Sequence, residues 1–333
     1  MVDVVITYVD GTDPLWQRDY AAFAGKPVLE KRFRDWGTLP YLVAGIRRFM
    51  PFVRNIFLVV SRESQVPSWV ESEPSRGDTP FSALLRNPIR ANAPKGVSPC
   101  DGSDPCDGTE SGAGEVKVVL HRDIIPEEYL PTFNSTEIEM FLHRIPGLAE
   151  RFIYFNDDIF PVRECRESDF FTGDGKIVKG FSCNLLRDGL YKIQCANADR
   201  IARKVAGCRK SLFFRRPQHT VSPMLKSASE ECYKAAEKEI LASLSPLRER
   251  KNLNQNLFLN YLYHTGRAVN RRLSSRHYSL AVASSETIAG FIENPTETFV
   301  CVNDVRMEED AYEKIRERLI SALETRIIQS TGE

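Results

Sequence analysis

The sequence of 333 residues predicts an α/β fold with a mainly parallel sheet and helices on both faces of that sheet. Two observations support this prediction. Four short apolar segments, at residues 4–9, 55–60, 116–120 and 152–155, are predicted to be strands, and the first two have the composition of buried strands. Helical patterns lie between these segments, and strands that alternate with helices pair in parallel. Ligands of such sheets bind beyond the carboxyl ends of the strands.

Local signals justify the elements in chain order. After the first strand, residues 10–14 (DGTDP) have the composition of a turn. Apolar residues keep a helical period over residues 39–46, and Pro51 ends this helix before the second strand. After the third strand, Asn134 and Glu137 form a capping-box pattern. It predicts a helix that Pro146 ends before the fourth strand.

The second half of the chain is predicted to be largely helical. Residues 220–295 are expected to form a mainly helical subregion, residues 298–302 a further strand, and residues 308–326 a closing helix. Residues 74–114 hold six prolines and six glycines of the 38 in the chain, and this composition predicts a flexible surface insertion. We therefore expect a single domain over residues 1–333, interrupted by this insertion.

The composition limits the class of protein. Lys and Arg number 45, as do Asp and Glu, and a net charge of zero argues against a nucleic-acid coat. No apolar run reaches the ~20 residues that cross a bilayer, and Asp3 stands where a signal peptide needs basic residues. The eight cysteines then indicate free thiols, and the spacing of Cys100 and Cys106 fits no standard zinc pattern. We expect a cytoplasmic protein that is able to associate peripherally with the inner face of the membrane; its oligomeric state stays open.

Polar residues directly follow several predicted strands. Asn156, Asp157 and Asp158 are the sharpest signal, because two carboxylates and an amide suit Mg²⁺ or Mn²⁺ when substrate phosphates complete the metal shell. The alternative, in which these aspartates cap a turn or stay solvated, remains open. Asp10 and Asp13 flank Gly11 after the first strand, but a simple turn explains this spacing at least as well.

Histidine and arginine side chains supply further candidates. His121 follows the third strand, and His219 lies in a basic segment with Arg215. A general acid or base, or a phosphate contact, suits His219. Arginine matches phosphate oxygens through its forked guanidinium group, although a solvated basic face explains the same residues. The sequence has no G-x-G-x-x-G, P-loop or G-x-S-x-G pattern, so an oxidoreductase, a P-loop NTPase and a hydrolase triad receive no support.

Four stretches of the sequence, taken together, resemble the Stealth family. This family includes bacterial capsular polysaccharide phosphotransferases and the animal lysosomal-enzyme N-acetylglucosamine-1-phosphotransferase. Residues 4–14 (VVITYVDGTDP) are similar to its first block, residues 32–69 to its second and residues 299–304 (FVCVND) to the start of its fourth. Residues 130–162, which end in RFIYFNDDIFPV, resemble the third block closely. The resemblance implies a Rossmann-like sheet of the glycosyltransferase-A type.

The resemblance also implies an activity. A sugar-1-phosphate transferase would move a hexose-1-phosphate, such as N-acetylhexosamine-1-phosphate, from a UDP-sugar to a glycan hydroxyl. It would release UMP and leave a phosphodiester, as in capsular or exopolysaccharide synthesis. Such phosphoryl transfer needs positioning and charge neutralisation more than covalent chemistry. The alternatives are a metal-dependent glycosyltransferase that releases UDP and a non-catalytic module that binds nucleotide sugars.

The implied site assigns roles to particular residues. The expected catalytic residues are Asn156, Asp157, Asp158 and His219, with His219 as the acid or base and Mg²⁺ or Mn²⁺ on the two aspartates. The expected substrate-binding residues are Asp10, Gly11, Asp13, Arg34, Asp35, His121, Asn134, Glu137, Arg215, Asn303 and Asp304.

Overall fold

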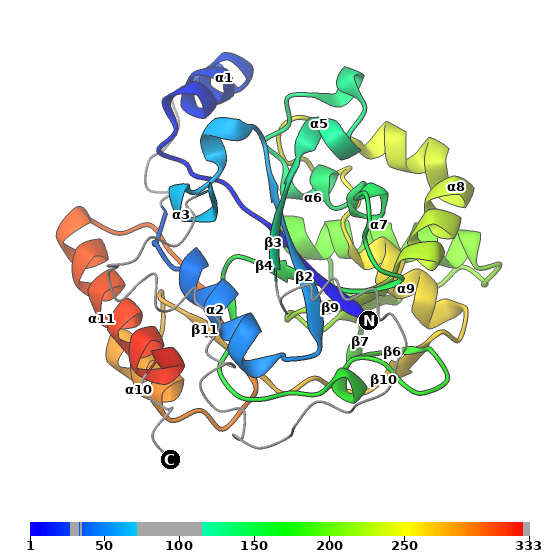
Figure 1. The fold of residues 1–333 in the computed structure, drawn as a ribbon. Helices are drawn as coiled ribbons and strands as arrows, with labels where there is room; N and C mark the ends of the chain where they lie inside the picture. The colour runs from blue at the N-terminus through cyan, green and yellow to red at the C-terminus, as the bar shows by residue number, and fades with distance from the viewer. Residues whose placement is uncertain (27–32, 34, 72–114, 329–333) are drawn as a thin grey trace, which may run out of the picture.

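The computed structural model describes residues 1–26, 33, 35–71 and 115–328. Its main sheet has five strands in the order β3-β2-β1-β4-β9 (Figure 1). The first four strands run parallel, and β9 pairs antiparallel with β4. The strands are β1 (Val2–Thr7), β2 (Val53–Val60), β3 (Glu115–Leu120), β4 (Arg151–Asn156) and β9 (Ser222–Leu225). The predicted α/β class with a mainly parallel sheet is confirmed.

The strand order changes direction at β1. Strands β2 and β3 lie on one side of β1, whereas β4 lies on the other side. The loops that leave two strands at such a point diverge, and the crevice between them is the usual ligand site of an open parallel sheet. Thr7 at the end of β1 is the register partner of Asn156 at the end of β4. This pairing brings Tyr8 and its neighbours close to the acidic pair that follows Asn156.

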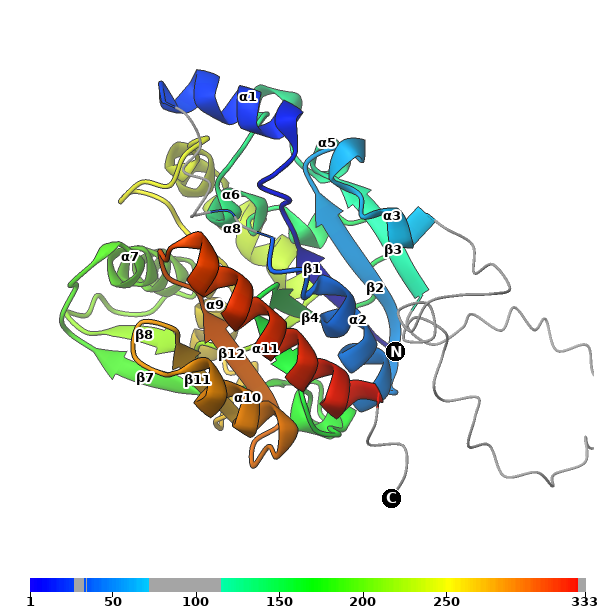
Figure 2. The ribbon, with the colours of Figure 1, turned by 90° about the vertical axis from the view of Figure 1, so that its left-hand side faces the viewer.

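Helices cover both faces of the sheet (Figures 1 and 2). One face carries α2 (Leu39–Phe49), α10 (Ser285–Glu293) and α11 (Glu309–Ile328), and α11 contacts the other two helices. The other face carries α7 (Leu190–Val205), α8 (Lys226–Ser243) and α9 (Asn256–His264). Helix α1 (Pro14–Ala24) lies beyond the carboxyl end of β1. The short helices are α3 (Ser68–Glu71), α5 (His121–Ile124) and α6 (Ser135–Ile138).

Three smaller sheets extend this core. A three-stranded sheet has the order β11-β12-β5, β7 pairs antiparallel with β8, and β6 pairs with β10. Their bounds are β5 (Ile159–Pro161), β6 (Ile177–Lys179), β7 (Phe181–Asn184), β8 (Phe214–Pro217), β10 (Ala268–Asn270), β11 (Ser275–Ser279) and β12 (Phe299–Asn303). Residues 220–295 therefore contain short strands as well as the helices α8, α9 and α10. No helix in the described ranges is long and apolar enough to cross a membrane.

The helix expected after Asn134 is shorter than predicted. It ends at Ile138, and a separate turn of 3₁₀ helix follows at Leu142–Arg144. The apolar period of this segment does not reflect one buried face, since nearly all of residues 136–143 are buried. Carboxylates at Glu137 and Glu139 instead accept hydrogen bonds from backbone N–H groups of the segment that covers them. The insertion predicted at residues 74–114 lies outside the described residues, as does Arg34.

Candidate active site

Two cavities meet at the crevice beside β1 and β4. One has a volume of about 370 Å³ and the other about 610 Å³. Both are lined by Tyr8 and Val9 after β1, by Phe33, and by Asp157 and Asp158 after β4. The acidic pair therefore forms part of the wall that the two cavities share. Two substrates placed in the two cavities would meet at these carboxylates.

The environment of the acidic pair disfavours negative charge. Asp157 reaches the water of the crevice but is surrounded by protein, and this burial together with the charge of Asp158 raises its pKa to about 7. Burial raises the pKa of Asp158 to about 6. Asp35 and Asp304, which line the smaller cavity, add further negative charge next to the pair. Four carboxylates thus converge at the crevice.

These carboxylates fit a divalent cation. The Oδ1 atom of Asp158 is buried and has no hydrogen-bond partner among the described residues. Its Oδ2 atom lies 3.6 Å from the Cys301 thiol. A buried oxygen without a partner is costly, and a cation bound there would satisfy it and relieve the mutual repulsion. Clustered carboxylate oxygens are the donors that Mg²⁺ and Mn²⁺ prefer.

His219 lies in the loop before β9 and lines the larger cavity together with the acidic pair. The ring of His219 reaches solvent, but the protein packed around it and the neighbouring His277 lower its pKa to about 4, so the ring is neutral near pH 7. The two ring centroids are 5.4 Å apart. A neutral imidazole in this position is able to accept a proton from a hydroxyl group.

A buried lysine fixes the segment that follows His219. The Nζ atom of Lys179 donates hydrogen bonds to the carbonyl oxygens of Thr220 at 3.0 Å and Val221 at 2.7 Å, and to the hydroxyl of Ser222 at 3.3 Å. On the other side, the Gln218 side chain exchanges two hydrogen bonds with the backbone of Leu273. His219 is therefore held in place from both directions along the chain.

Five other predicted residues also line the cavities. Asn156 and His121 belong to the larger cavity, and Asp35, Asn303 and Asp304 belong to the smaller one. His121 is buried, and its Nε2 atom has no hydrogen-bond partner in the described part of the chain. Burial and the charge of Arg62 lower the pKa of His121 to about 4.

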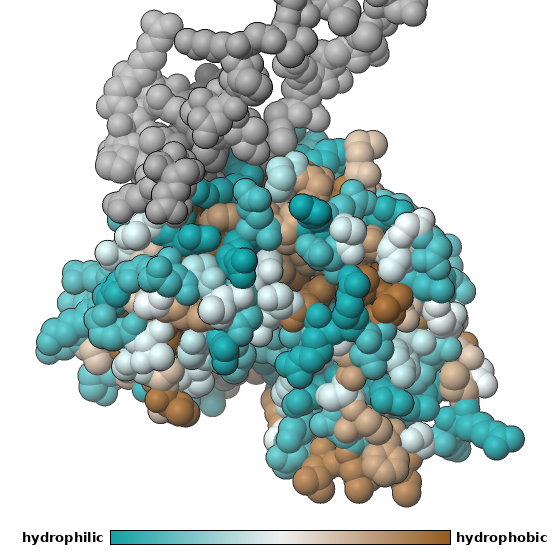
Figure 3. All heavy atoms as spheres, turned by 90° about the horizontal axis from the view of Figure 1, so that it is seen from below, coloured by the Kyte–Doolittle hydropathy of each residue, from teal (hydrophilic) through white to brown (hydrophobic). Residues whose placement is uncertain are grey.

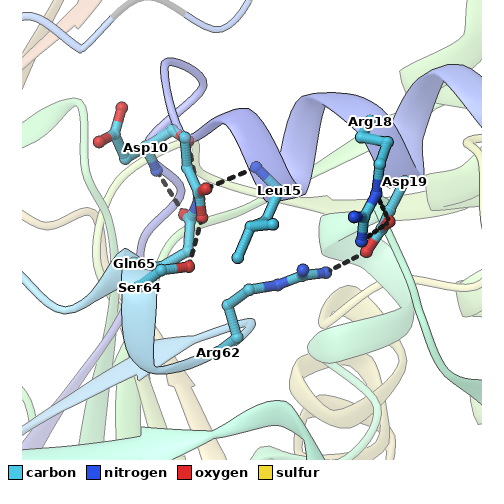
Figure 4. A network of polar contacts seen from close by, with 8 residues as sticks. Asp10, Leu15, Arg18, Asp19, Arg62, Ser64 and Gln65 are labelled. Carbon is cyan, nitrogen blue, oxygen red and sulfur yellow. Dashed lines mark hydrogen bonds and ion pairs between the residues drawn. The ribbon is translucent and has the colours of Figure 1, made fainter.

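The three residues expected from the first turn line neither cavity. The carboxylate of Asp10 accepts hydrogen bonds from Thr12, and the Asp10 amide donates to Gln65 at 2.7 Å (Figure 4). Asp13 caps α1 and accepts hydrogen bonds from the side chains of Ser64 and Gln65. These contacts join the loop after β1 to the loop after β2. Gly11 serves packing, since a Cβ atom there would lie 1.9 Å from the backbone oxygen of Phe33.

Asn134, Glu137 and Arg215 also lie away from both cavities. The side-chain amide of Asn134 donates to the Ser245 carbonyl and to Asn252, while its oxygen caps α6. Glu137 accepts a hydrogen bond of 3.0 Å from the Ser245 amide. The Arg215 guanidinium group lies over the Tyr263 ring, 5.2 Å from its centroid. These side chains hold loops and strands together and do not face the crevice.

The larger cavity contains residues that the sequence reasoning did not select. Glu139 is buried there, and burial raises its pKa to about 7. Arg248 supplies a cation and bonds to the Ser135 hydroxyl. Aromatic rings line one end, with centroids 5.0–5.5 Å apart: Trp16, Tyr20, Phe33 and Phe133. Trp16 and Tyr20 are four residues apart on α1, so they lie on one face of the helix. This spacing is visible in the sequence and could have predicted the helix.

The fold and the site place an acidic pair at the switch point of a mainly parallel sheet. The family model "Stealth protein CR2, conserved region 2" matches residues 109–179. This range includes the third block of the predicted resemblance. The chain belongs to the Stealth family of phosphotransferases, and the prediction of this family is confirmed.

Curated relatives carry related names. A capsular polysaccharide phosphotransferase of Actinobacillus suis is 33% identical over 287 residues, which cover 80% of this chain and 66% of that protein. The capsular polysaccharide phosphotransferase cps1A of Actinobacillus pleuropneumoniae is 31% identical, and the match covers 80% of this chain and 67% of that protein. This chain thus spans about two thirds of the length of these two relatives. WcwK of Streptococcus pneumoniae is 26% identical, with 97% of this chain and 96% of WcwK covered.

A solved structure resembles the whole chain at a low level. The galactosyltransferase LgtC, in complex with donor and acceptor sugar analogues, covers 96% of this chain and 95% of its own. The sequence identity is 11% and the TM-score is 0.38. A similarity at this level gives no information about activity.

Proposed function

We propose that this chain is a sugar-1-phosphate transferase of capsular or exopolysaccharide synthesis. It moves a hexose-1-phosphate, such as N-acetylhexosamine-1-phosphate, from a UDP-sugar to a hydroxyl of a glycan and releases UMP. The observation that carries the proposal is the acidic pair, Asp157 and Asp158, in a wall shared by two cavities. The names of the curated relatives, which are phosphotransferases of capsular polysaccharide, support the same reaction.

The residues of the crevice have distinct roles in this proposal. Asp157 and Asp158 would hold Mg²⁺ or Mn²⁺, which when bound neutralises charge on phosphate oxygens. The neutral His219 accepts the proton of the acceptor hydroxyl while the oxygen of that hydroxyl forms a bond to the sugar-bearing phosphorus. The bond between this phosphorus and the bridging oxygen breaks, and UMP leaves. Because His219 lines the larger cavity, the acceptor approaches from there.

The bonds that break give the test of this reaction. The protein is incubated with UDP-sugars, Mg²⁺ and candidate glycans, and the released nucleotide is identified by chromatography. We expect UMP and a product with a phosphodiester signal in phosphorus NMR, with the anomeric configuration of the donor retained. UDP with a phosphorus-free product would instead identify a glycosyltransferase. Binding of a UDP-sugar without turnover of any donor would identify a non-catalytic module.

We propose in addition that one end of the molecule docks on an anionic membrane. Four large apolar side chains are exposed there to 51–78%: Leu185, Leu186, Leu212 and Phe213. They lie together because they flank Asn184 and Phe214, which are register partners in the antiparallel strands β7 and β8, and Figure 3 shows apolar side chains gathered at this projecting end. Exposed basic residues from the same two segments add charge complementarity to anionic lipid: Arg187, Arg209 and Lys210.

This docking surface adjoins the larger cavity. Tyr191, at the start of α7 just after the exposed leucines, lines that cavity. Docking would therefore bring the cavity close to an acceptor glycan that is anchored in the membrane.

Sedimentation with vesicles tests the docking. We expect binding to vesicles that contain anionic lipid and loss of binding in the double variant Leu186→Ser with Leu212→Ser. Val282→Ser removes an equally exposed side chain, 91% accessible, from the loop before α10 and is the matched control. Equal vesicle binding by all variants would refute the surface. Self-association that the double variant abolishes, without vesicle binding, would assign the patch to a second copy of the chain.

A further inference from the structure

Next to the acidic pair lies a second group of side chains with a different chemistry. His219, His277 and Cys301 place one ligand atom each within 4.8 Å of one another. They come from three elements: the loop before β9, the strand β11 and the strand β12. His277 and Cys301 are register partners in neighbouring parallel strands, so the backbone pairing sets their side chains beside each other on one face of the sheet.

The donor atoms of this group differ from those of the acidic pair. Imidazole nitrogen and thiolate sulfur suit zinc and similar transition metals, whereas Mg²⁺ and Mn²⁺ prefer carboxylate oxygen. Three protein ligands with an open fourth position form a common type of zinc site. The two sets of donors are adjacent, because Cys301 Sγ lies 3.6 Å from Asp158 Oδ2 and 3.3 Å from Asn303 Oδ1.

The exposed histidines suit metal binding, whereas burial and the charge of Asp158 raise the pKa of the Cys301 thiol, so the metal has to displace its proton. Both histidines are exposed to solvent, whereas Cys301 is fully buried, so an ion from solvent reaches the imidazoles before the thiol. Each imidazole contributes the lone pair of one nitrogen. The Cys301 thiol gives up its proton to solvent as the sulfur binds the metal, and water completes the shell. No electron is transferred.

We propose that His219, His277 and Cys301 bind Zn²⁺ and that this ion inhibits the enzyme. The inhibitory part rests on the proposed function, in which His219 accepts the proton of the acceptor hydroxyl. A nitrogen lone pair that is donated to zinc is no longer available to that proton. The metal also draws the Cys301 sulfur away from Asp158 and so disturbs the acidic pair. The chain thus carries two metal sites of opposite effect, one of oxygen donors and one of nitrogen and sulfur donors.

Cobalt reports on the site independently of activity. The full chain is titrated with Co²⁺ in the presence of Mg²⁺, which has no absorption of its own. We expect a single equivalent to produce the absorption of a cobalt–thiolate bond, and Zn²⁺ to remove it by displacement. His277→Ala and Cys301→Ser should each weaken binding by about 100-fold or more. Cys183→Ser changes an exposed cysteine on β7, outside the group, and should leave the titration unchanged.

Turnover measurements test the inhibition. Micromolar Zn²⁺ should suppress UMP release in the presence of Mg²⁺, a zinc chelator should restore it, and His277→Ala should resist the inhibition. Absence of the cobalt–thiolate absorption, or its persistence in both His277→Ala and Cys301→Ser, would overturn the site. A cobalt signal in a protein that turns over no nucleotide sugar would leave the metal site standing and refute the proposed function instead.

Discussion

Lys179 on β6 makes the free energy of unfolding depend on pH in a way that one substitution should remove. Its side chain is fully buried, and the partners of its Nζ atom in the described structure are neutral oxygen atoms. Burial lowers its pKa from 10.5 to about 7. Above pH 7, the unfolded chain therefore binds a proton that the folded chain has released. The protein gains stability as the pH rises from 7 towards 10.5, because the unfolded state binds more protons.

The size of the effect follows from the pKa difference. Each unit of pH between the two pKa values contributes about 1.4 kcal/mol. Since the folded group is half titrated at pH 7, the gain from pH 7 to pH 9 is about 2 kcal/mol. Lys179→Met keeps a similar volume and has no proton to release. It also leaves the Thr220 and Val221 carbonyls without a donor, which is a constant cost of about 1 kcal/mol for each.

Urea unfolding at pH 7, 8 and 9 measures this dependence. The stability of the wild type relative to Lys179→Met should rise by about 2 kcal/mol across this range. All other titrating groups are common to the two proteins and cancel. Lys176→Met, in a more exposed position three residues earlier, serves as the control and should follow the wild-type curve. A difference that stays constant with pH would refute the neutralisation of Lys179 by burial.

Three further predictions concern single side chains. Asp157→Asn is nearly isosteric and removes a charge that its surroundings disfavour, so the circular dichroism spectrum should be kept and the melting temperature should not fall, while UMP release falls by about 100-fold; full activity would contradict the role of Asp157 at the metal. Glu137→Gln should gain stability over the wild type by up to about 3 kcal/mol between pH 4.5 and pH 8, because burial raises the pKa of Glu137 to about 7 and the wild type loses stability as the pH rises through this range. The kinetic constants of this variant should not change, and a raised KM would show that Glu137 takes part in substrate binding. Asp3→Ala should cost about 3 kcal/mol in urea unfolding, because Asp3 is fully buried and pairs with Arg54 at 2.6 Å; a loss below about 1 kcal/mol would refute its structural role.

Local signals in the sequence were sufficient to predict the parallel strands of the main sheet. The four strands are short apolar segments in the sequence, and they form the parallel part of the sheet, in which β1 and β4 are mostly buried and β3 is a largely exposed edge strand. The strand-end rule placed Asn156 and Asp157 at the crevice because strand direction alone decides which end faces the ligand. The same rule named Asp10 and Asp13, which lie at the correct end of β1 but turn away to bond with Thr12 and Gln65. The direction of a side chain after a strand depends on loop contacts that no local pattern contains.

The remaining residues depend on tertiary contacts. Glu137 and Glu139 are two positions apart, and only Glu139 lines a cavity, because the segment ends its helix at Ile138 and turns. His277 and Cys301 are neighbours through the pairing of β11 with β12, with α10 between the two strands in sequence. Arg248 reaches the larger cavity from a loop that the buried side chain of Asn252 organises. Such proximities follow from the packing of the whole chain.

The wall that the two cavities share has a consequence for the order of events. In the proposed reaction, donor and acceptor would occupy the two cavities on either side of Asp157 and Asp158, so neither would have to leave before the other enters. The hexose-1-phosphate would then pass directly from donor to acceptor, without a covalent intermediate on the protein. Initial rates measured against both substrates should give intersecting double-reciprocal lines, the pattern of a ternary complex, and the parallel lines of a substituted-enzyme mechanism should not appear.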